Sequence, residues 1–159
     1  MRKSGSKLLV LLGNGDGTFQ AASNFNAGDQ PVWVNVADLN GDTFPDLVSA
    51  NANSSNLSVL LGNGNGTFQA AISFGVGIEP RSVTIADMNG DSFPDLVSAN
   101  IESGNLSVLL GYGNGNFQNA TNFGTGMGPV SVVVADLDGD THNDLVSANI
   151  NGDSLSVLL

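Results

Sequence analysis

The stretch that decides the fold reads ADLNGDTFPDL, residues 37–47, and it places Asp38, Asp42 and Asp46 within nine residues. Like charges in one tight loop repel one another. At about 5 Å and an effective dielectric constant near 20, each pair costs about 3 kcal/mol. The pattern returns as ADMNGDSFPDL at 86–96 and as ADLDGDTHNDL at 135–145. A motif written three times indicates that something of opposite charge offsets the repulsion.

The whole chain repeats together with this loop. The same pattern opens at four leucines, each 49 residues after the one before: Leu8, Leu57, Leu106 and Leu155. The first two repeats are identical at 32 of 49 positions, which favours tandem duplication. We therefore expect a short N-terminal segment, three repeats and the first strand of a fourth: 1–7, 8–56, 57–105, 106–154 and 155–159.

Within a repeat, apolar residues alternate with a period of two, which is typical of strands. The first complete set of strands is expected at 32–38, 46–51, 57–62 and 67–74, separated by Gly, Asn, Asp and Pro clusters. Four short antiparallel strands in about 50 residues indicate an all-β fold built from β-propeller blades.

Counting strands from residue 8 gives thirteen, or about three blades. Closed propellers have about 4–8 blades. We therefore expect either part of a longer propeller or self-association, for example two chains forming a six-bladed ring.

Composition excludes several classes of function. The net charge is −11 with only four Lys and Arg residues, so a nucleic-acid partner is not expected. No apolar stretch approaches the about 18 residues of a membrane span, and we expect no membrane insertion. The run LLVLL at 8–12 is shorter than the about 7–15 residues of a signal-peptide core, and it recurs as LSVLL. We interpret it as a strand, so no signal peptide is visible.

The acidic loops have the ligand pattern of a calcium site. Oxygen-bearing side chains occupy loop positions 1, 3, 5 and 9, a glycine at position 4 permits the bend, and the position 7 carbonyl is a natural backbone ligand. Calcium accepts six to eight oxygens in irregular geometry. We predict three calcium ions, one per loop, held by Asp38, Asn40, Asp42, Phe44 and Asp46; by Asp87, Asn89, Asp91, Phe93 and Asp95; and by Asp136, Asp138, Asp140, His142 and Asp144.

Other acidic motifs fit less well. An EF-hand loop needs Gly at position 6 and Glu at position 12 between helices, whereas here glycine is at position 4 and strands flank the loop. Tandem nonapeptide calcium turns recur every nine residues, whereas GNGDGTF appears once per repeat. An Asx-rich turn without metal would not require the same four ligand positions in all three loops.

The ADxNGDxxPDL segments, with FGVGIEP and FGTGMGP ahead of two of them, resemble the FG-GAP/VCBS repeats of integrin-α-like β-propellers. The resemblance covers residues 8–159 and implies a calcium-stabilised propeller on extracellular or cell-surface proteins that mediate adhesion or ligand recognition. The chain departs from the pattern at Phe25-Asn26 and at His142-Asn143. In the third loop, the extra carboxylate of Asp138 favours tighter calcium binding, while the loss of proline loosens the loop.

We expect a module that is not an enzyme. The single histidine, His142, lies inside a metal loop, cysteine is absent, and the recurring aspartates already have ligand roles. The favoured function is adhesion or recognition of a protein or glycan. The alternatives are a structural spacer or a carbohydrate-binding domain of a larger secreted exoenzyme.

Alternating turns of a four-stranded blade lie at opposite ends. The acidic loops and the Gly/Asn hairpins share one end and hardly vary, whereas the turns at the other end differ in every repeat. Loops on a rigid scaffold often bind ligands, so we predict a ligand face at the variable end. Unconstrained drift is the alternative explanation, and Trp33 would equally serve packing between blades. The candidate ligand-binding residues are Asp29, Trp33, Glu79 and Arg81.

Overall fold

The computed structural model describes residues 6–159, which form β-strands, turns and loops without a helix. No segment of this range therefore forms an apolar helix long enough to cross a membrane. The strands are β1 (Lys7–Val10), β2 (Ser23–Asn26), β3 (Pro31–Ala37), β4 (Asp46–Asn51), β5 (Asn56–Leu60), β6 (Ile72–Gly75), β7 (Pro80–Ala86), β8 (Asp95–Asn100), β9 (Asn105–Leu109), β10 (Thr121–Gly124), β11 (Pro129–Ala135), β12 (Asp144–Asn149) and β13 (Ser154–Leu158).

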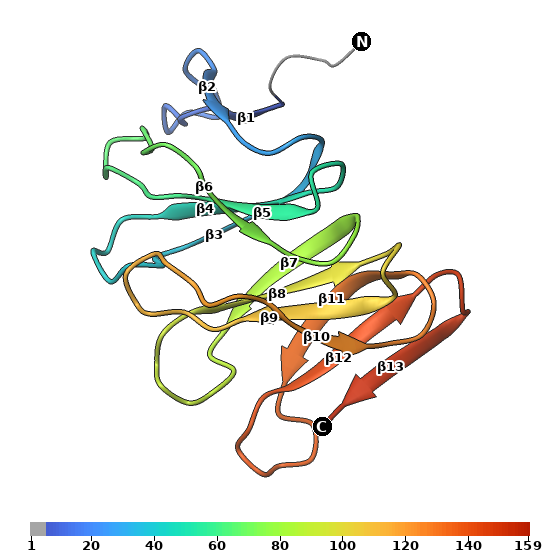
Figure 1. Ribbon diagram of the computed structural model, residues 1–159. Coiled ribbons are helices and arrows are strands. Elements are labelled where there is room, and N and C mark those ends of the chain that lie inside the picture. Colours follow the sequence, from blue (N-terminus) through green and yellow to red (C-terminus); the bar gives the residue numbers. More distant parts are fainter. Residues whose placement is uncertain (1–5) are drawn as a thin grey trace.

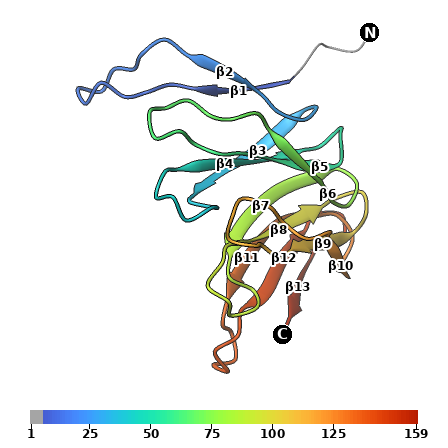
Figure 2. The ribbon, with the colours of Figure 1, turned by 60° about the vertical axis from the view of Figure 1, so that its left-hand side comes forward.

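These thirteen strands form four antiparallel sheets, which we call blades 1 to 4. Blade 1 is β1–β2, blade 2 is β3–β4–β5–β6, blade 3 is β7–β8–β9–β10, and blade 4 is β11–β12–β13. The blades follow one another around a fan, with β3, β7 and β11 at its inner side (Figures 1 and 2). The all-β propeller-type fold and the count of thirteen strands are confirmed.

The 49-residue spacing is preserved in the strand registers. Leu8 lies opposite Phe25 in blade 1, as Leu57 lies opposite Phe74 in blade 2. The interpretation of the LLVLL run as a strand is confirmed for residues 8–10, which lie in β1, whereas Leu11 and Leu12 follow the strand. Residues 1–5 of the N-terminal segment lie outside the described range.

The fourth strand of blade 2 is shorter than predicted. The expected strand at 67–74 is observed only at Ile72–Gly75, preceded by a single bridge between Gly62 and Phe68. The ring of Phe68 packs edge to face on Phe25 of blade 1, with 5.1 Å between centroids. Phe68 therefore packs across to the neighbouring blade, and the chain rejoins its own sheet only at Ile72.

The hydrophobic core lies between the blades. One cluster joins blades 2 and 3 through fully buried side chains such as Val59, Val83 and Leu96. A second joins blades 3 and 4 through Val97 of blade 3 and Val132 and Leu145 of blade 4. Burying each such side chain contributes about 1.5–3 kcal/mol, so face-to-face stacking of the sheets is the main source of stability.

Each of blades 2, 3 and 4 also contains a polar Ser-Asn-Ser triad that the sequence analysis did not identify, fully buried in blades 2 and 3 and partly exposed in blade 4. In blade 3, Ser98 Oγ donates to Asn100 Oδ1, and Asn100 Nδ2 donates to Asn105 Oδ1 and Ser107 Oγ, both at 2.8 Å. Buried polar groups are tolerated when their hydrogen bonds are satisfied. The triad ties β8 to β9, and Ser107 Oγ also accepts the Gly77 N–H of the turn before β7 at 3.1 Å. The sequence signal of the triad is the recurrent LVSAN…LSVL.

Candidate metal loops and the variable-loop face

The acidic loops connect the first and second strands of blades 2, 3 and 4, and each wraps around its first aspartate. Asp38 Oδ1 accepts the Gly41 N–H at 2.8 Å, and Asp38 Oδ2 accepts the Thr43 N–H at 2.7 Å. Gly41 has a φ of 78° and Thr43 a φ of 71°. A left-handed backbone conformation costs a non-glycine residue about 1–2 kcal/mol. Thr43 adopts this conformation while its N–H points at the Asp38 carboxylate. Burial raises the pKa of Asp38, but these N–H groups lower it below its usual value overall.

The last aspartate of each loop is a buried anchor. Asp46 is fully buried, and its two carboxylate oxygens accept the Leu39 N–H at 2.8 Å and the Gly62 N–H at 2.7 Å. Asp95 makes the same bonds to Met88 and Gly111. Desolvation raises the pKa of Asp46 and Asp95 above the usual range, because two N–H donors do not fully replace lost water. A cation near these carboxylates would favour their charged form.

The middle ligand positions of the first two loops are exposed, except that Asn40 is half-buried. Asn40 Nδ2 donates to Asp42 Oδ2 at 2.9 Å, and Asn89 and Asp91 repeat this contact. Only the amide oxygen can bind a hard cation, so Asn40 would have to present Oδ1 in place of Nδ2. The neighbouring Phe44 ring packs over Gly64 of the following hairpin, where any Cβ would meet it at 2.6 Å.

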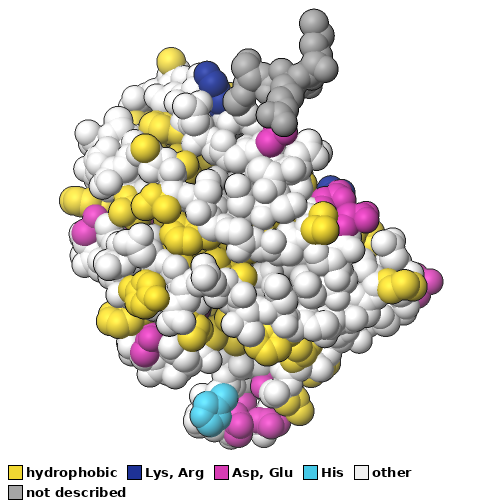
Figure 3. All heavy atoms as spheres, viewed as in Figure 1, with side chains coloured by type: hydrophobic (Ala, Val, Ile, Leu, Met, Phe, Trp, Pro, Cys, Tyr) yellow, Lys and Arg dark blue, Asp and Glu magenta, His cyan; other side chains and the backbone are white. Residues whose placement is uncertain are grey.

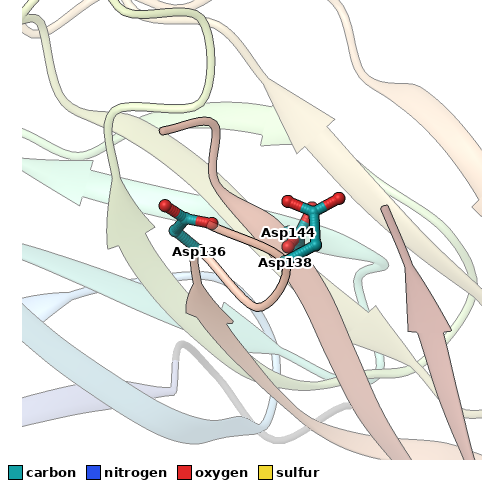
Figure 4. A group of neighbouring side chains, drawn as sticks. All are labelled: Asp136, Asp138 and Asp144. Carbon is teal, nitrogen blue, oxygen red and sulfur yellow. The ribbon is translucent and has the colours of Figure 1, made fainter. Parts of the chain in front are cut away.

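The third loop brings three carboxylates together. Asp136, Asp138 and Asp144 offer oxygen atoms that all lie within 4.8 Å of one another, and within residues 6–159 they are the one such group of acidic, His or Cys side chains (Figure 4). Asp144 is buried, whereas the other two are exposed. Three converging carboxylates are the donor set that Ca²⁺ prefers, so this cluster fits a hard cation.

The departures of the third loop have structural consequences. His142 Nδ1 lies 3.1 Å from Asp140 Oδ2, and this hydrogen bond raises the pKa of His142 above its usual value. Asn143, which replaces the proline, donates from Nδ2 to the Asp87 carbonyl at 2.8 Å. The third loop is thereby tied to the second.

The four candidate ligand residues do not form one cluster. Glu79 and Arg81 form an ion pair at the start of β7. Trp33, 48% exposed, lines a shallow pocket of about 210 Å³ with residues of blades 1 and 2, and that pocket contains none of the other candidates. Asp29 donates its N–H to Ser54 Oγ at 2.9 Å.

The variable end has two structural features that the four candidate ligand residues did not indicate. A β-bulge begins the first strand of each complete blade and places Arg81 in an irregular register between Pro80 and Ser82. A groove of about 340 Å³ also opens between blades 3 and 4, lined by Ile101–Gly104, Met127–Gly128 and Asn151. The sequence signal for this groove was the divergence of these turns between repeats.

The three loops, their 49-residue spacing and the four-stranded blades correspond to a known family. A model described as FG-GAP-like repeat matches residues 3–49, 38–98 and 87–147. The chain belongs to this family. The resemblance stated from the sequence is confirmed, and the FG-GAP matches at 38–98 and 87–147 begin at the first aspartate of an acidic loop. No curated protein matches the chain.

A solved structure shares the FG-GAP chain's fold. It is a lectin from Agrocybe aegerita, studied for its specific recognition of non-reducing terminal N-acetylglucosamine. The TM-score is 0.54 at 24% sequence identity, and the match covers 95% of this chain and 46% of the lectin. The chain therefore spans about half the length of that structure, and the likeness shows the fold.

Proposed function

We propose that this FG-GAP-like chain is a non-catalytic, calcium-stabilised recognition module of an extracellular or cell-surface protein. Its partner, a glycan or a protein, binds the variable-loop face. The observation that carries the proposal is the difference between the two ends of the blades. One end repeats the same loop geometry three times, and the other presents different side chains on the same scaffold.

Calcium is supported by the donor chemistry of the acidic loops. Oxygen ligands recur at the same positions, three carboxylates converge in the third loop, and Asp46 and Asp95 are buried without a cationic neighbour among the described residues. The proposed ligands are those predicted from the sequence, including the carbonyls of Phe44, Phe93 and His142. In this role calcium holds the loops and performs no chemistry.

Recognition is supported by the side chains at the opposite end. Gln30 and Glu79 keep long polar side chains at φ values of 57° and 60°, where the third repeat has Gly128. Strained non-glycine residues cluster at functional sites. The lectin neighbour shows that a related scaffold serves glycan recognition, which favours a glycan as the first partner to test.

The test is a glycan array that includes glycans ending in N-acetylglucosamine, run beside a screen of extracellular proteins. Bound candidates are then measured with Met127→Ala, which alters the groove between blades 3 and 4. Tyr112→Ala, a similarly exposed residue in the hairpin at the opposite end, is the matched control. Loss of affinity in the first variant alone supports the proposed face.

A ligand whose affinity falls with Tyr112→Ala and not with Met127→Ala places the site at the calcium end and contradicts the proposal. The spacer alternative predicts no ligand in either screen. Calcium binding is measured separately, so failure of the ligand face leaves the metal assignment independently testable.

A further inference from the structure

The seams between blades contain a contact that recurs with the repeat. Phe68, in the hairpin between the third and fourth strands of blade 2, packs edge to face on Phe25 of blade 1. Phe117 of blade 3 packs in the same way on Phe74 of blade 2, with 5.3 Å between centroids. Phe123 of blade 3 is the equivalent of Phe25 and Phe74, so the repeat predicts that a phenylalanine from the hairpin of the next blade packs on it. Within residues 6–159 it has no such partner and is 41% exposed.

Phe123 instead lines a largely apolar pocket of about 400 Å³ between blades 3 and 4. Leu110 lies in the same pocket. The equivalents of Leu110 in the two preceding repeats are Leu12 and Leu61, and each packs against a glycine in the hairpin of the next blade. A Cβ added to Gly66 would lie 2.6 Å from Leu12, and one added to Gly115 would lie 2.7 Å from Leu61. The pocket therefore lacks the hairpin glycine that would pack on Leu110 and the hairpin phenylalanine that would pack on Phe123.

The matching glycine and phenylalanine are found on the hairpin of blade 1. Gly17 and Phe19 stand one repeat before the seam-forming Gly66 and Phe68. Nothing lies within 4 Å of a Cβ placed on Gly17, and Phe19 is 63% exposed. The hairpin has the backbone conformation of its equivalents, since Gly15 and Gly17 have φ values of 85° and 89°.

The inner side of the fan shows the same complementarity. β3, β7 and β11 lie side by side in that order. Val34 and Val36 of β3 are 51% and 54% exposed, whereas Val83, the equivalent of Val34 on β7, is 1% exposed. At the other end of the row, Val133 of β11 is 64% exposed. Figure 3 shows that apolar side chains are exposed in several patches on this face of the molecule.

We propose that two copies of this chain join head to tail. The blade 1 hairpin of each copy enters the pocket between blades 3 and 4 of the other, and β3 of each lies beside β11 of the other. Each chain contributes three repeats. One copy of this sequence supplies three repeats, three copies supply nine, and two copies supply six, which lies within the about 4–8 blades of closed propellers because blade 1 of each copy completes blade 4 of the other. The lectin of similar fold is about twice as long as this chain, as its covered share shows.

Closure requires an exchange of strands, because β1 and β13 are equivalent. β1 and β2 pair in the same register as the third and fourth strands of blade 2. In the dimer, β1 of one copy therefore takes the place of β13 beside β12 of the other copy, and β2 becomes the fourth strand of that blade. β1 and β13 differ at two positions, where Ser154 and Ser156 of β13 correspond to Lys7 and Leu9 of β1. Ser156 Oγ accepts hydrogen bonds from Asn149 Nδ2 and the Gly126 N–H, both at 2.9 Å, and β1 has Leu9 there.

Two single-cysteine variants test the arrangement directly, because the chain contains no cysteine. Phe19→Cys and Phe123→Cys are mixed, oxidised in the presence of calcium and analysed by non-reducing electrophoresis. We expect a covalent species of twice the 16.2 kDa chain mass from the mixture and none from either variant alone. Self-linkage of Phe19→Cys, or a mixture that stays uncrosslinked, would overturn the proposal.

The native mass and its response to substitution give a second test. Light scattering at tens of micromolar should report twice the chain mass, and Phe19→Ala should weaken the dimer at least about tenfold. Ile78→Ala, an equally exposed residue at the variable end, should leave the dimer unchanged. Leu9→Ser should strengthen the dimer by restoring the two hydrogen bonds. A monodisperse monomer, or a species larger than two chains, would overturn the closed ring.

Discussion

The two ends of the blades are held together by different chemistry. At the acidic-loop end, carboxylates such as Asp46 and Asp95 collect backbone N–H groups and leave negative charge that a cation can neutralise. At the variable end, the neutral side chains of the triads around Asn51, Asn100 and Asn149 satisfy their hydrogen bonds with neighbouring Asn and Ser side chains. If the proposed calcium sites are correct, the first end should depend on an ion for its stability, whereas the second should be stable without one.

Under the calcium proposal, this difference accounts for the larger sequence differences among the three repeats at the variable end. A loop that must gather four oxygen ligands around one point tolerates few changes. A turn whose strands are already fastened by a buried triad can vary its exposed residues, as in 52–55, 101–104 and 150–153. The comparison leads to four predictions, ordered from the largest expected effect to the smallest.

Removal of calcium should have the largest effect. Three sites at a free calcium concentration one hundred times Kd contribute about 2.7 kcal/mol each, or about 8 kcal/mol in total. For a domain of this size, each kcal/mol shifts Tm by about 2–4 °C, so a chelator should lower Tm by about 15–30 °C. Thermal melting with and without EDTA, together with ion counting on the purified protein, measures the effect. An unchanged Tm would contradict the role of calcium.

Asp95→Ala should destabilise the chain by about 3–5 kcal/mol. It leaves the buried N–H groups of Met88 and Gly111 without acceptors, at about 1–3 kcal/mol each, and opens a cavity. The loss should persist in EDTA, because the anchor serves the loop itself. Asp91→Asn, at an exposed ligand position, is the control and should matter only when calcium is present. Urea unfolding in both conditions separates the two residues.

Asn100→Ala should cost about 2–3 kcal/mol, equally with and without calcium. It removes the acceptor of Ser98 and the donor to Asn105 and Ser107 in a fully buried site. The control is Asn122→Ala, which removes a single partner of Ser107 at an exposed position. If the cost of Asn100→Ala fell markedly in EDTA, the two ends would be coupled, and the comparison drawn above would fail.

Glu79→Gly should have the smallest effect on stability and a favourable one, about 0.5–1 kcal/mol. Glycine relieves the left-handed backbone at a φ of 60°, where the third repeat already has Gly128. The same change should weaken ligand binding by removing the carboxylate and its pairing with Arg81. Gln30→Gly is the matched substitution in the preceding blade. A large loss of stability would show that the ion pair, and not the ligand, explains the strained residue.

Much of the fold was determined by the sequence alone. Alternating apolar residues and the 49-residue period specify the strands of each blade, because a period of two fixes which side chains share a face. The strand at 46–51 was located to the residue, and the thirteen strands were counted correctly. The acidic loops were found for a similar reason, since their ligand spacing is local and recurs three times.

Only the tertiary structure decided how the blades meet. The sequence shows that Phe68 and Phe117 recur, but their packing on Phe25 and Phe74 of the preceding blade depends on contacts between different sheets. For this reason the fourth strand was predicted five residues too early, at 67 instead of 72.

The division between buried and exposed equivalents was likewise invisible in the sequence. Val34 and Val83 occupy the same repeat position, yet one is half exposed and the other is buried, because β7 has β3 of the preceding blade beside it, whereas blade 1, formed by β1 and β2 alone, has no first strand to lie beside β3. Local spacing determines strands, turns and ligand positions. Burial depends on which sheet lies opposite, and that is set by the arrangement of the whole fan.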